Sequence, residues 1–208
     1  ELIINFKKII SSKKELQKAV DLWCEDKEEA LNYYCHISIW NTSLITDFTR
    51  MFSGAKKFNS NIDYNASTDK WNTSNVTKMD YMFTGAEAFN GNVGNWDTSK
   101  VSSMLHIFTN AKSFNRPIRN WNVTLITDMN NMFSGAHAFN QDISTWNTSN
   151  VTNMNSMFHQ AVDFNQEIGG WDVSNVADMS KMVSYSTFIF TASIMTEEND
   201  TSDFKVSS

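Results

Sequence analysis

Large apolar residues recur at a fixed interval along this chain, with polar and turn-forming residues between them. Phe-Asn pairs and a column of alanines keep one period, and tryptophan marks that period most clearly. The tryptophans of the series are Trp40, Trp71, Trp96, Trp121, Trp146 and Trp171. They lie 25 residues apart except for a first interval of 31, which indicates a six-residue insertion at about residues 64–70. Such self-similarity is the signature of a repeat protein, and about six copies are present, the last one degraded.

Each copy divides into two segments with different patterns. In residues 151–161 and their equivalents, apolar residues stand three and four apart, which predicts a short helical or 3-10 turn. The segment Phe-Asn-x-x-Ile-x-x-Trp is short and bounded by polar turn residues, which predicts a strand and its exit. We therefore expect an α/β repeat, a leucine-rich-repeat-like solenoid of about six 25-residue coils. The copies must stack, because one copy buries too little apolar area to offset the entropy of ordering it.

The two ends differ from the repeats. Ser12 to Glu15 fits a capping box, apolar residues follow at helical spacing up to Trp23, and Asp26 offers a second helix start. We expect an N-terminal helical cap over residues 1–39 and the repeats over residues 40–185. Residues 186–208 are predicted to be a degraded repeat and a mobile acidic tail.

Composition and charge narrow the function classes. The net charge is −6, from 23 acidic and 17 basic residues, and no Lys/Arg cluster tracks a phosphate backbone, which argues against a nucleic-acid partner. No apolar run reaches the length of about 18 residues that a membrane span requires. The sequence begins with Glu1 rather than Met, so we expect a fragment that lacks any targeting segment.

The residues with reactive side chains form no catalytic or metal-binding pattern. The four histidines are scattered, and the carboxylates lack the spacing of a calcium loop. We expect no enzyme activity, no cofactor and no metal. Cys24 and Cys35 match no zinc spacing; a disulfide between them is our preferred interpretation, and two reduced, buried thiols are the alternative.

Positions that are identical in every copy serve the fold, so a ligand is expected where the copies differ. The Trp and Met columns are predicted to form the core, and the Asn column from Asn59 to Asn165 is predicted to satisfy backbone groups between coils. The positions after Phe-Asn and after Ile/Val vary and would line one face of the predicted strand. The binding candidates on it are Arg116, Arg119, Gln141, Asp142, Gln166 and Glu167. A merely solvated face is the alternative.

Eight Asn-x-Ser/Thr sequons occur, but six of them result from the repeat itself. Asn65 lies in the insertion and Asn199 in the tail, so these two are the candidate glycosylation sites if the protein is secreted.

The segment WNTSNVTNMNSMFHQAVDFNQEIGGWDVSNV, residues 146–176, resembles the BspA-like repeat of bacterial and protist surface proteins, also described as a Mycoplasma-type lipoprotein repeat. Trp, Val-Thr, Met-Phe, Ala and Phe-Asn all hold their places in it. The likeness covers roughly residues 12–185, and the C-terminal stretch departs from it. The resemblance implies a leucine-rich-repeat-like solenoid, display at the cell surface or outside the cell, and a role in adhesion or protein interaction, with no catalytic residues to carry over.

The leading hypothesis is a non-catalytic surface or secreted module that binds a protein or glycan through the variable face. One alternative is a structural spacer or coat element without a specific ligand. Another is binding to ice or a polysaccharide through threonines in two columns, at positions 42, 73, 98 and 148 and at positions 46, 77, 127 and 152.

Overall fold

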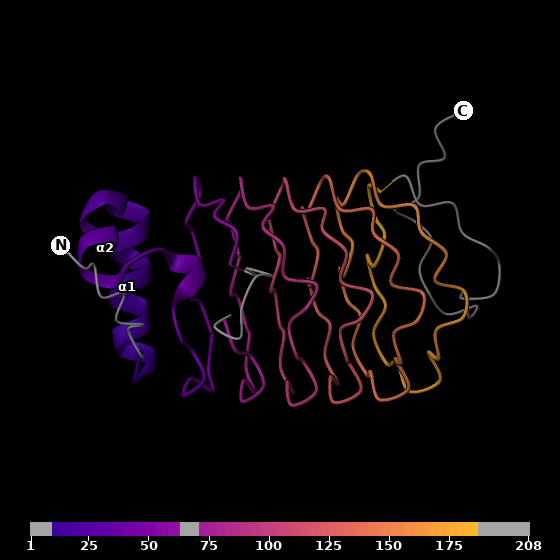
Figure 1. The fold of residues 1–208 in the computed structure, drawn as a ribbon. Helices are drawn as coiled ribbons and strands as arrows, with labels where there is room; N and C mark the ends of the chain where they lie inside the picture. The colour runs from indigo at the N-terminus through magenta and orange to yellow at the C-terminus, as the bar shows by residue number, and fades with distance from the viewer. Residues whose placement is uncertain (1–9, 63–70, 187–208) are drawn as a thin grey trace.

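A computed structural model describes residues 10–62 and 71–186 of the chain. Two α-helices come first, α1 (Lys13–Glu25) and α2 (Lys27–Tyr34), followed by the 3-10 helix η1 (Ile37–Ile39). From there the chain winds through coils that lie side by side, one per repeat, with the helices at the N-terminal end of the stack (Figure 1). Most of the predicted tail, residues 187–208, and the insertion at 63–70 lie outside the described residues.

Helix α1 begins where the capping pattern predicts. The Ser12 side chain accepts a hydrogen bond from the backbone N–H of Glu15, and Asp26 starts α2 in the same way by accepting from Glu29. The apolar face of α1 is buried against the first coil, and Trp23 on that face meets Trp40 edge to face at 5.9 Å. A hydrogen bond also joins α1 to the first coil: the Gln17 side chain donates to the backbone carbonyl of Met51 at 3.1 Å.

The prediction of an α/β, leucine-rich-repeat-like solenoid is wrong. Within residues 40–62 and 71–186 the structure has neither a helix nor a strand, and strand-type pairing between neighbouring coils is limited to isolated parallel bridges. These bridges join Asp47 with Lys78, Lys78 with Ser103, Asp128 with Asn153, and Asn153 with Asp178. They lie in the segment that we expected to be helical, and the segment after Phe-Asn forms turns instead of a strand.

Consecutive β-turns explain why apolar residues spaced three and four apart do not form a helix. Met82 donates to the carbonyl of Met79, and Ala86 donates to that of Phe83, each closing a four-residue turn. The third residue of each turn has positive φ, 56° at Tyr81 and 70° at Gly85. Positive φ at this position is the requirement of a type II turn and is incompatible with a right-handed helix. A run of such turns brings the same apolar residues to the interior.

Backbone donors alternate between two kinds of partner. The N–H groups of Met79, Tyr81, Phe83 and Gly85 donate to carbonyls of the next coil at 2.8–2.9 Å, whereas those of Met82 and Thr84 stay within their own turns. Each coil is thus held by its own turns and by the next coil.

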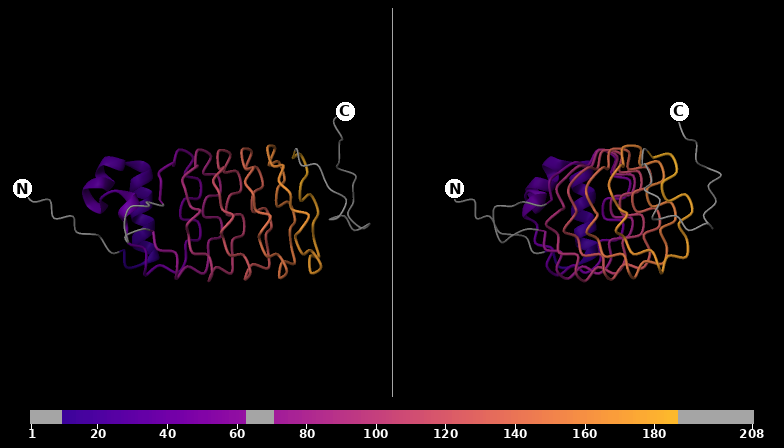
Figure 2. Two further views of the ribbon diagram at one scale, coloured as in Figure 1. Left: turned by 45° about the vertical axis from the view of Figure 1, so that its right-hand side comes forward. Right: turned by 90° about the vertical axis from the view of Figure 1, so that its right-hand side faces the viewer.

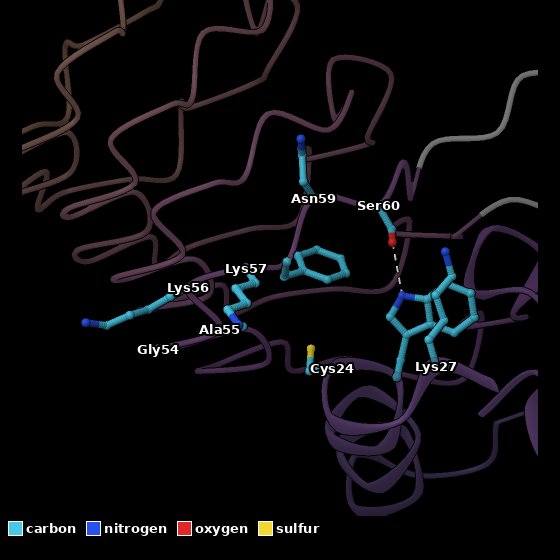
Figure 3. A pocket seen from close by; sticks show the side chains of 10 residues that line it. Cys24, Lys27, Gly54, Ala55, Lys56, Lys57, Asn59 and Ser60 are labelled. Carbon is cyan, nitrogen blue, oxygen red and sulfur yellow. Dashed lines mark hydrogen bonds between the residues drawn. The ribbon is translucent and has the colours of Figure 1, made fainter. Parts of the chain in front are cut away.

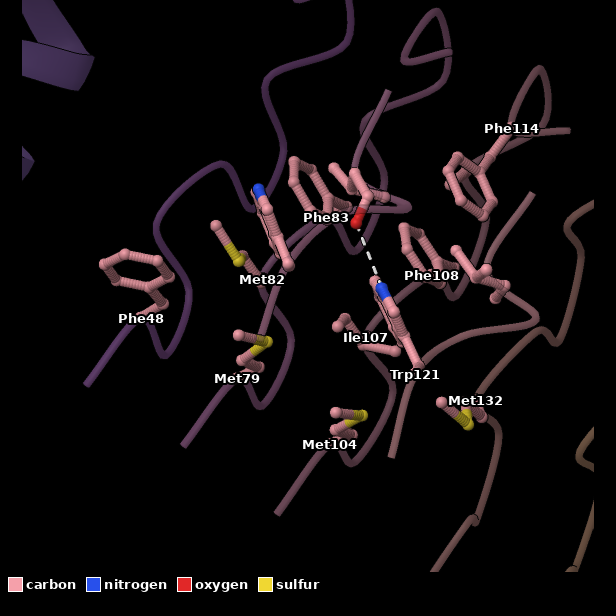
Figure 4. Packing of buried hydrophobic residues seen from close by; sticks show 14 of the residues in the cluster. Phe48, Met79, Met82, Phe83, Met104, Ile107, Phe108, Phe114, Trp121 and Met132 are labelled. Atoms are coloured by element: carbon pink, nitrogen blue, oxygen red, sulfur yellow. Dashed lines mark hydrogen bonds between the residues drawn. The ribbon is translucent and has the colours of Figure 1, made fainter. Parts of the chain in front are cut away.

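The core is a set of columns that run the length of the stack, and the prediction that the Trp and Met columns belong to it is confirmed. Phe83 and Phe108 stack at 5.5 Å with an angle of 4° between their rings, and Trp96 and Trp121 stack at 6.3 Å (Figure 4). The indole N–H of Trp121 donates to the carbonyl of Val93 at 3.0 Å, which satisfies a polar atom inside the stack.

One of the two threonine columns is also part of the interior. Thr42, Thr73, Thr98 and Thr148 are buried. The hydroxyl of Thr98 donates to the carbonyl of Asn122 in the next coil at 3.0 Å, and Thr42 and Thr148 make the equivalent bond. This row therefore cannot touch ice or a polysaccharide, and only the row at positions 46, 77, 127 and 152 is exposed. Seen along the stack, the outlines of the coils overlap, and each coil is displaced from the one before it (Figure 2).

Candidate functional site

The Asn column forms a ladder along one side of the stack, as the sequence predicts. The Oδ1 atom of each asparagine accepts a hydrogen bond from the backbone N–H of the equivalent asparagine in the next coil. The bonds run from Asn90 to Asn59 (2.8 Å) and from Asn115 to Asn90, Asn140 to Asn115 and Asn165 to Asn140 (3.0 Å each). A side chain thus takes the place of a backbone ladder here, which is why no strand forms at this position.

The residue after each ladder asparagine differs from coil to coil. Where this residue has a long side chain, the side chain contacts the ladder asparagine of the preceding coil. Gln141 Nε2 donates to Asn115 Oδ1 at 2.7 Å, and Gln166 Nε2 donates to Asn140 Oδ1 at 2.8 Å. Arg116 Nε donates instead to the backbone carbonyl of Asn90 at 2.7 Å. These three candidate binding residues therefore stabilise contacts between coils, and the two glutamine amides are partly buried.

The remaining candidates lie further out on the same side. Arg119 and Asp142 form an ion pair between neighbouring coils, and both side chains are about half exposed. Glu167 is exposed. The six predicted residues thus share one face, on which positive groups stand in one coil and negative groups in the next two.

A polar pocket of about 300 Å³ opens on this face beside Arg116, the first of the candidates. Its lining residues are Asn59, Asn61, Asn90, Gly91, Asn92 and Arg116. Of these, sequence reasoning had singled out Arg116 alone as a ligand residue. Asn59 and Asn90 were assigned to the structural Asn column, whereas Asn61, Gly91 and Asn92 are variable positions that were not chosen as ligand residues. The absence of a side chain at Gly91, in a column that otherwise carries side chains, was a usable signal.

Gly91 is required by close packing. A Cβ atom at this position would lie 2.8 Å from the backbone carbonyl oxygen of Ser60 and 2.8 Å from the ring of Phe89. Real Cβ atoms do not approach a backbone oxygen so closely. The second coil therefore cannot carry the side chain that covers the ladder in later coils, and Asn59 stays uncovered.

A larger cleft of about 620 Å³ lies between α1 and the first coil, around Trp23, Cys24, Lys27, Lys57 and Ser60. Its positive groups do not converge: Lys56 extends away from the cleft, whereas Lys27 lies on the opposite side, against the Trp23 ring (Figure 3). Lys56 pairs with Glu87 of the next coil at 3.3 Å. The Trp23 indole N–H donates to Ser60 Oγ at 3.0 Å, which ties the helix to the coil. These contacts pack helix α1 against the first coil, and we do not assign a binding site to this cleft.

The two cysteines are free thiols in this structure, Cys24 exposed and Cys35 partly buried, so the preferred disulfide is not formed here. Partial burial of the sulfur, with Asp21 and Glu25 nearby, raises the pKa of Cys24 to about 11. Both candidate glycosylation sites, Asn65 and Asn199, lie outside the described residues.

A second variable column lies on a different side of the coils. Arg50, Tyr81 and His106 occupy equivalent turn positions; the Arg50 guanidinium lies 4.4 Å from the Tyr81 ring centre, and the Tyr81 and His106 rings stack at 4.8 Å. The pKa of His106 is lowered from the ordinary value of histidine, mainly because the imidazole is partly buried. Neither of the two pockets described above is lined by these residues, so we do not assign the binding site to this column.

The comparison with known families gives one result. The family described as "Mycoplasma protein of unknown function, DUF285" matches residues 25–125 and, a second time, residues 114–205. The chain belongs to the DUF285 family. The two matches in one DUF285 chain agree with its repetitive sequence and are compatible with a Mycoplasma-type surface repeat. No curated protein and no solved structure matches the chain significantly.

Two further properties of this DUF285 chain concern membranes and metals. Among the described residues, neither α-helix has the length and apolar character that crossing a membrane demands. Within residues 10–62 and 71–186, His, Cys, Asp and Glu side chains do not gather in groups that would hold a metal ion.

Proposed function

We propose that this DUF285 chain is a non-catalytic binding module that contacts its ligand through the face beside the Asn ladder. The observation that carries the proposal is the pocket lined by Arg116 on the variable face, where the stack leaves polar groups uncovered. The ion pair of Arg119 with Asp142 and the exposed carboxylate of Glu167 extend this face along the stack. The coils share the same core residues, and their side chains vary along one face. Such a repeat protein suits the recognition of an extended partner.

The ligand class in this proposal is a glycan or a protein with polar groups at its surface, and the module acts outside the cell or on its surface, in adhesion. The resemblance of residues 146–176 to BspA-like repeats supports this location and role. The competing proposal is a spacer or coat element, which the long interlocked stack would also serve.

A screen of the intact chain against glycan and cell-surface-protein arrays tests the proposal. The informative variant carries Arg116→Glu and Arg119→Glu. The matched control carries Lys14→Glu and Lys181→Glu, which make the same change in charge at exposed positions outside this face. Circular dichroism confirms that both variants are folded.

We expect a binder that the Arg116/Arg119 variant loses and the control retains. Loss of binding in both variants would indicate attraction by charge alone and would contradict a specific face. The absence of any binder would favour the spacer.

A further inference from the structure

The polar pocket beside Gly91 corresponds to the space that a glutamine amide covers in later coils. In the fourth repeat the backbone N–H of Asn140 donates to Asn115 Oδ1, and the amide of Gln141 donates to the same oxygen. The fifth repeat repeats this arrangement with Gln166 over Asn140. A carbonyl oxygen has two lone pairs, so both bonds can form on one oxygen.

In the first coil the corresponding oxygen, Asn59 Oδ1, accepts only one of these two bonds. Asn59 Oδ1 accepts from the N–H of Asn90 at 2.8 Å, and Gly91 stands where Gln141 and Gln166 stand in later coils. Among the described residues no donor takes the second lone pair. The lateral space is open as well, because Ser60 and Gly91 are both small.

Arg116 supplies the complementary group at the other side of the pocket. Its Nε is engaged with the Asn90 carbonyl, and its terminal nitrogens have no partner among the described residues. Guanidinium nitrogens are donors only. The pocket therefore offers one unoccupied acceptor, Asn59 Oδ1, and a set of charged donors, those of Arg116.

We propose that this pocket binds the carboxamide of an acetamido sugar. The amide N–H of the ligand would donate to Asn59 Oδ1, and its carbonyl would accept from Arg116, so the ligand takes the place of the missing glutamine amide. The proposal rests on the proposed binding function and specifies the ligand class of the same face.

The size of the pocket favours a sugar over the side-chain amide of a protein. Its volume of about 300 Å³ lies at the lower end of the range of about 300–1,000 Å³ for small-molecule pockets. A single sugar ring with its acetamido group fits this class.

Isothermal titration of the intact chain with N-acetylglucosamine tests the proposal. Glucose is the matched ligand that lacks the acetamido group. Free glutamine is the second control ligand, because it carries the amide of a protein side chain. The central variant is Arg116→Gln. It places at position 116 the residue that the next two coils carry, so its fold should persist, which thermal unfolding checks. Lys181→Gln is the control, because Lys181 is exposed and lies outside this face.

We expect N-acetylglucosamine to bind and glucose not to bind. Arg116→Gln should lose about tenfold or more in affinity, because a hydrogen bond to a charged group is removed, and Lys181→Gln should lose none. Equal binding of glucose, equal binding of glutamine, or unchanged binding in Arg116→Gln would overturn the proposal. A partner found on the arrays without acetamido-dependent binding here would overturn the ligand class and leave the proposed binding function standing.

Discussion

The Oδ1 atom of Asn115 accepts two hydrogen bonds from the next coil, from the backbone N–H of Asn140 at 3.0 Å and from the Gln141 amide at 2.7 Å. One side-chain oxygen thus satisfies a backbone donor and fixes a surface side chain. The bond to the backbone explains why the Asn of the Phe-Asn pair keeps its place in the repeat.

Replacement of Asn115 should destabilise the stack. Asn115→Ala removes the acceptor for both bonds and leaves the Asn140 N–H without its partner, which costs about 1–3 kcal/mol. Urea unfolding followed by circular dichroism measures the change. Asn120→Ala, at an exposed position, is the control and should stay within about 0.5 kcal/mol of the parent chain. Similar losses in the two variants would show that the ladder contributes nothing beyond helping to cover the surface.

The tryptophan column contains a natural comparison. Trp121 donates its indole N–H to the Val93 carbonyl, whereas the buried indole N–H of Trp96 has no acceptor among the described residues. Trp→Phe removes similar apolar area at both positions. Trp121→Phe should therefore cost about 0.5–1.5 kcal/mol more than Trp96→Phe, the net contribution of one hydrogen bond. Equal costs in urea unfolding would mean that the indole bonds do not stabilise the column.

Two turn glycines differ only in what surrounds them. Gly135 and Gly54 have φ of 69° and 75°, so alanine at either position bears the cost of the left-handed conformation, about 1–2 kcal/mol. A Cβ atom at position 135 would also lie 2.2 Å from Asn110 Oδ1, whereas at position 54 nothing lies within 4 Å. Gly135→Ala should therefore lower the melting temperature more than Gly54→Ala. The opposite order would contradict the close packing of Gly135 against Asn110 in the neighbouring coil.

The thiol of Cys24 should react slowly near neutral pH. Its pKa is raised to about 11 from an ordinary value of 9.0, and the thiolate is the reactive form, so at pH 8 its thiolate fraction is about a hundredfold below that of an ordinary cysteine. Alkylation by iodoacetamide in a Cys35→Ser variant, followed by mass spectrometry, should accelerate with pH up to about pH 11. A rate that stops rising near pH 9 would show that the pKa of Cys24 is not raised by its surroundings.

The repeat period, the helix start at Ser12, the core columns and the Asn ladder could all be predicted from the sequence, since each is a direct consequence of spacing. The conformation within a coil could not. The spacing of Met79, Met82 and Phe83 fits a helix and a run of turns equally well. Tyr81 and His106 do not signal a left-handed residue, because bulky side chains seldom adopt one. In the structure, hydrogen bonds to the next coil hold these residues in that conformation, and the sequence of a single copy does not reveal such contacts.

The candidate face was predicted in part. Variation after Phe-Asn drew attention to this side of the chain, and the binding role of this side stays a prediction. The variation did not show that Gln141 and Gln166 cover the ladder while Gly91 leaves a gap. That distinction depends on which oxygen each amide reaches.

Chemical-shift mapping of the ¹⁵N-labelled chain with the strongest ligand from the arrays tests the binding account most directly. The account predicts that the shifts centre on Asn59, Asn90 and Arg116 and extend along the ladder face toward Asp142. Shifts that centre on Tyr81 and His106, or on the cleft around Trp23 and Ser60, would contradict it.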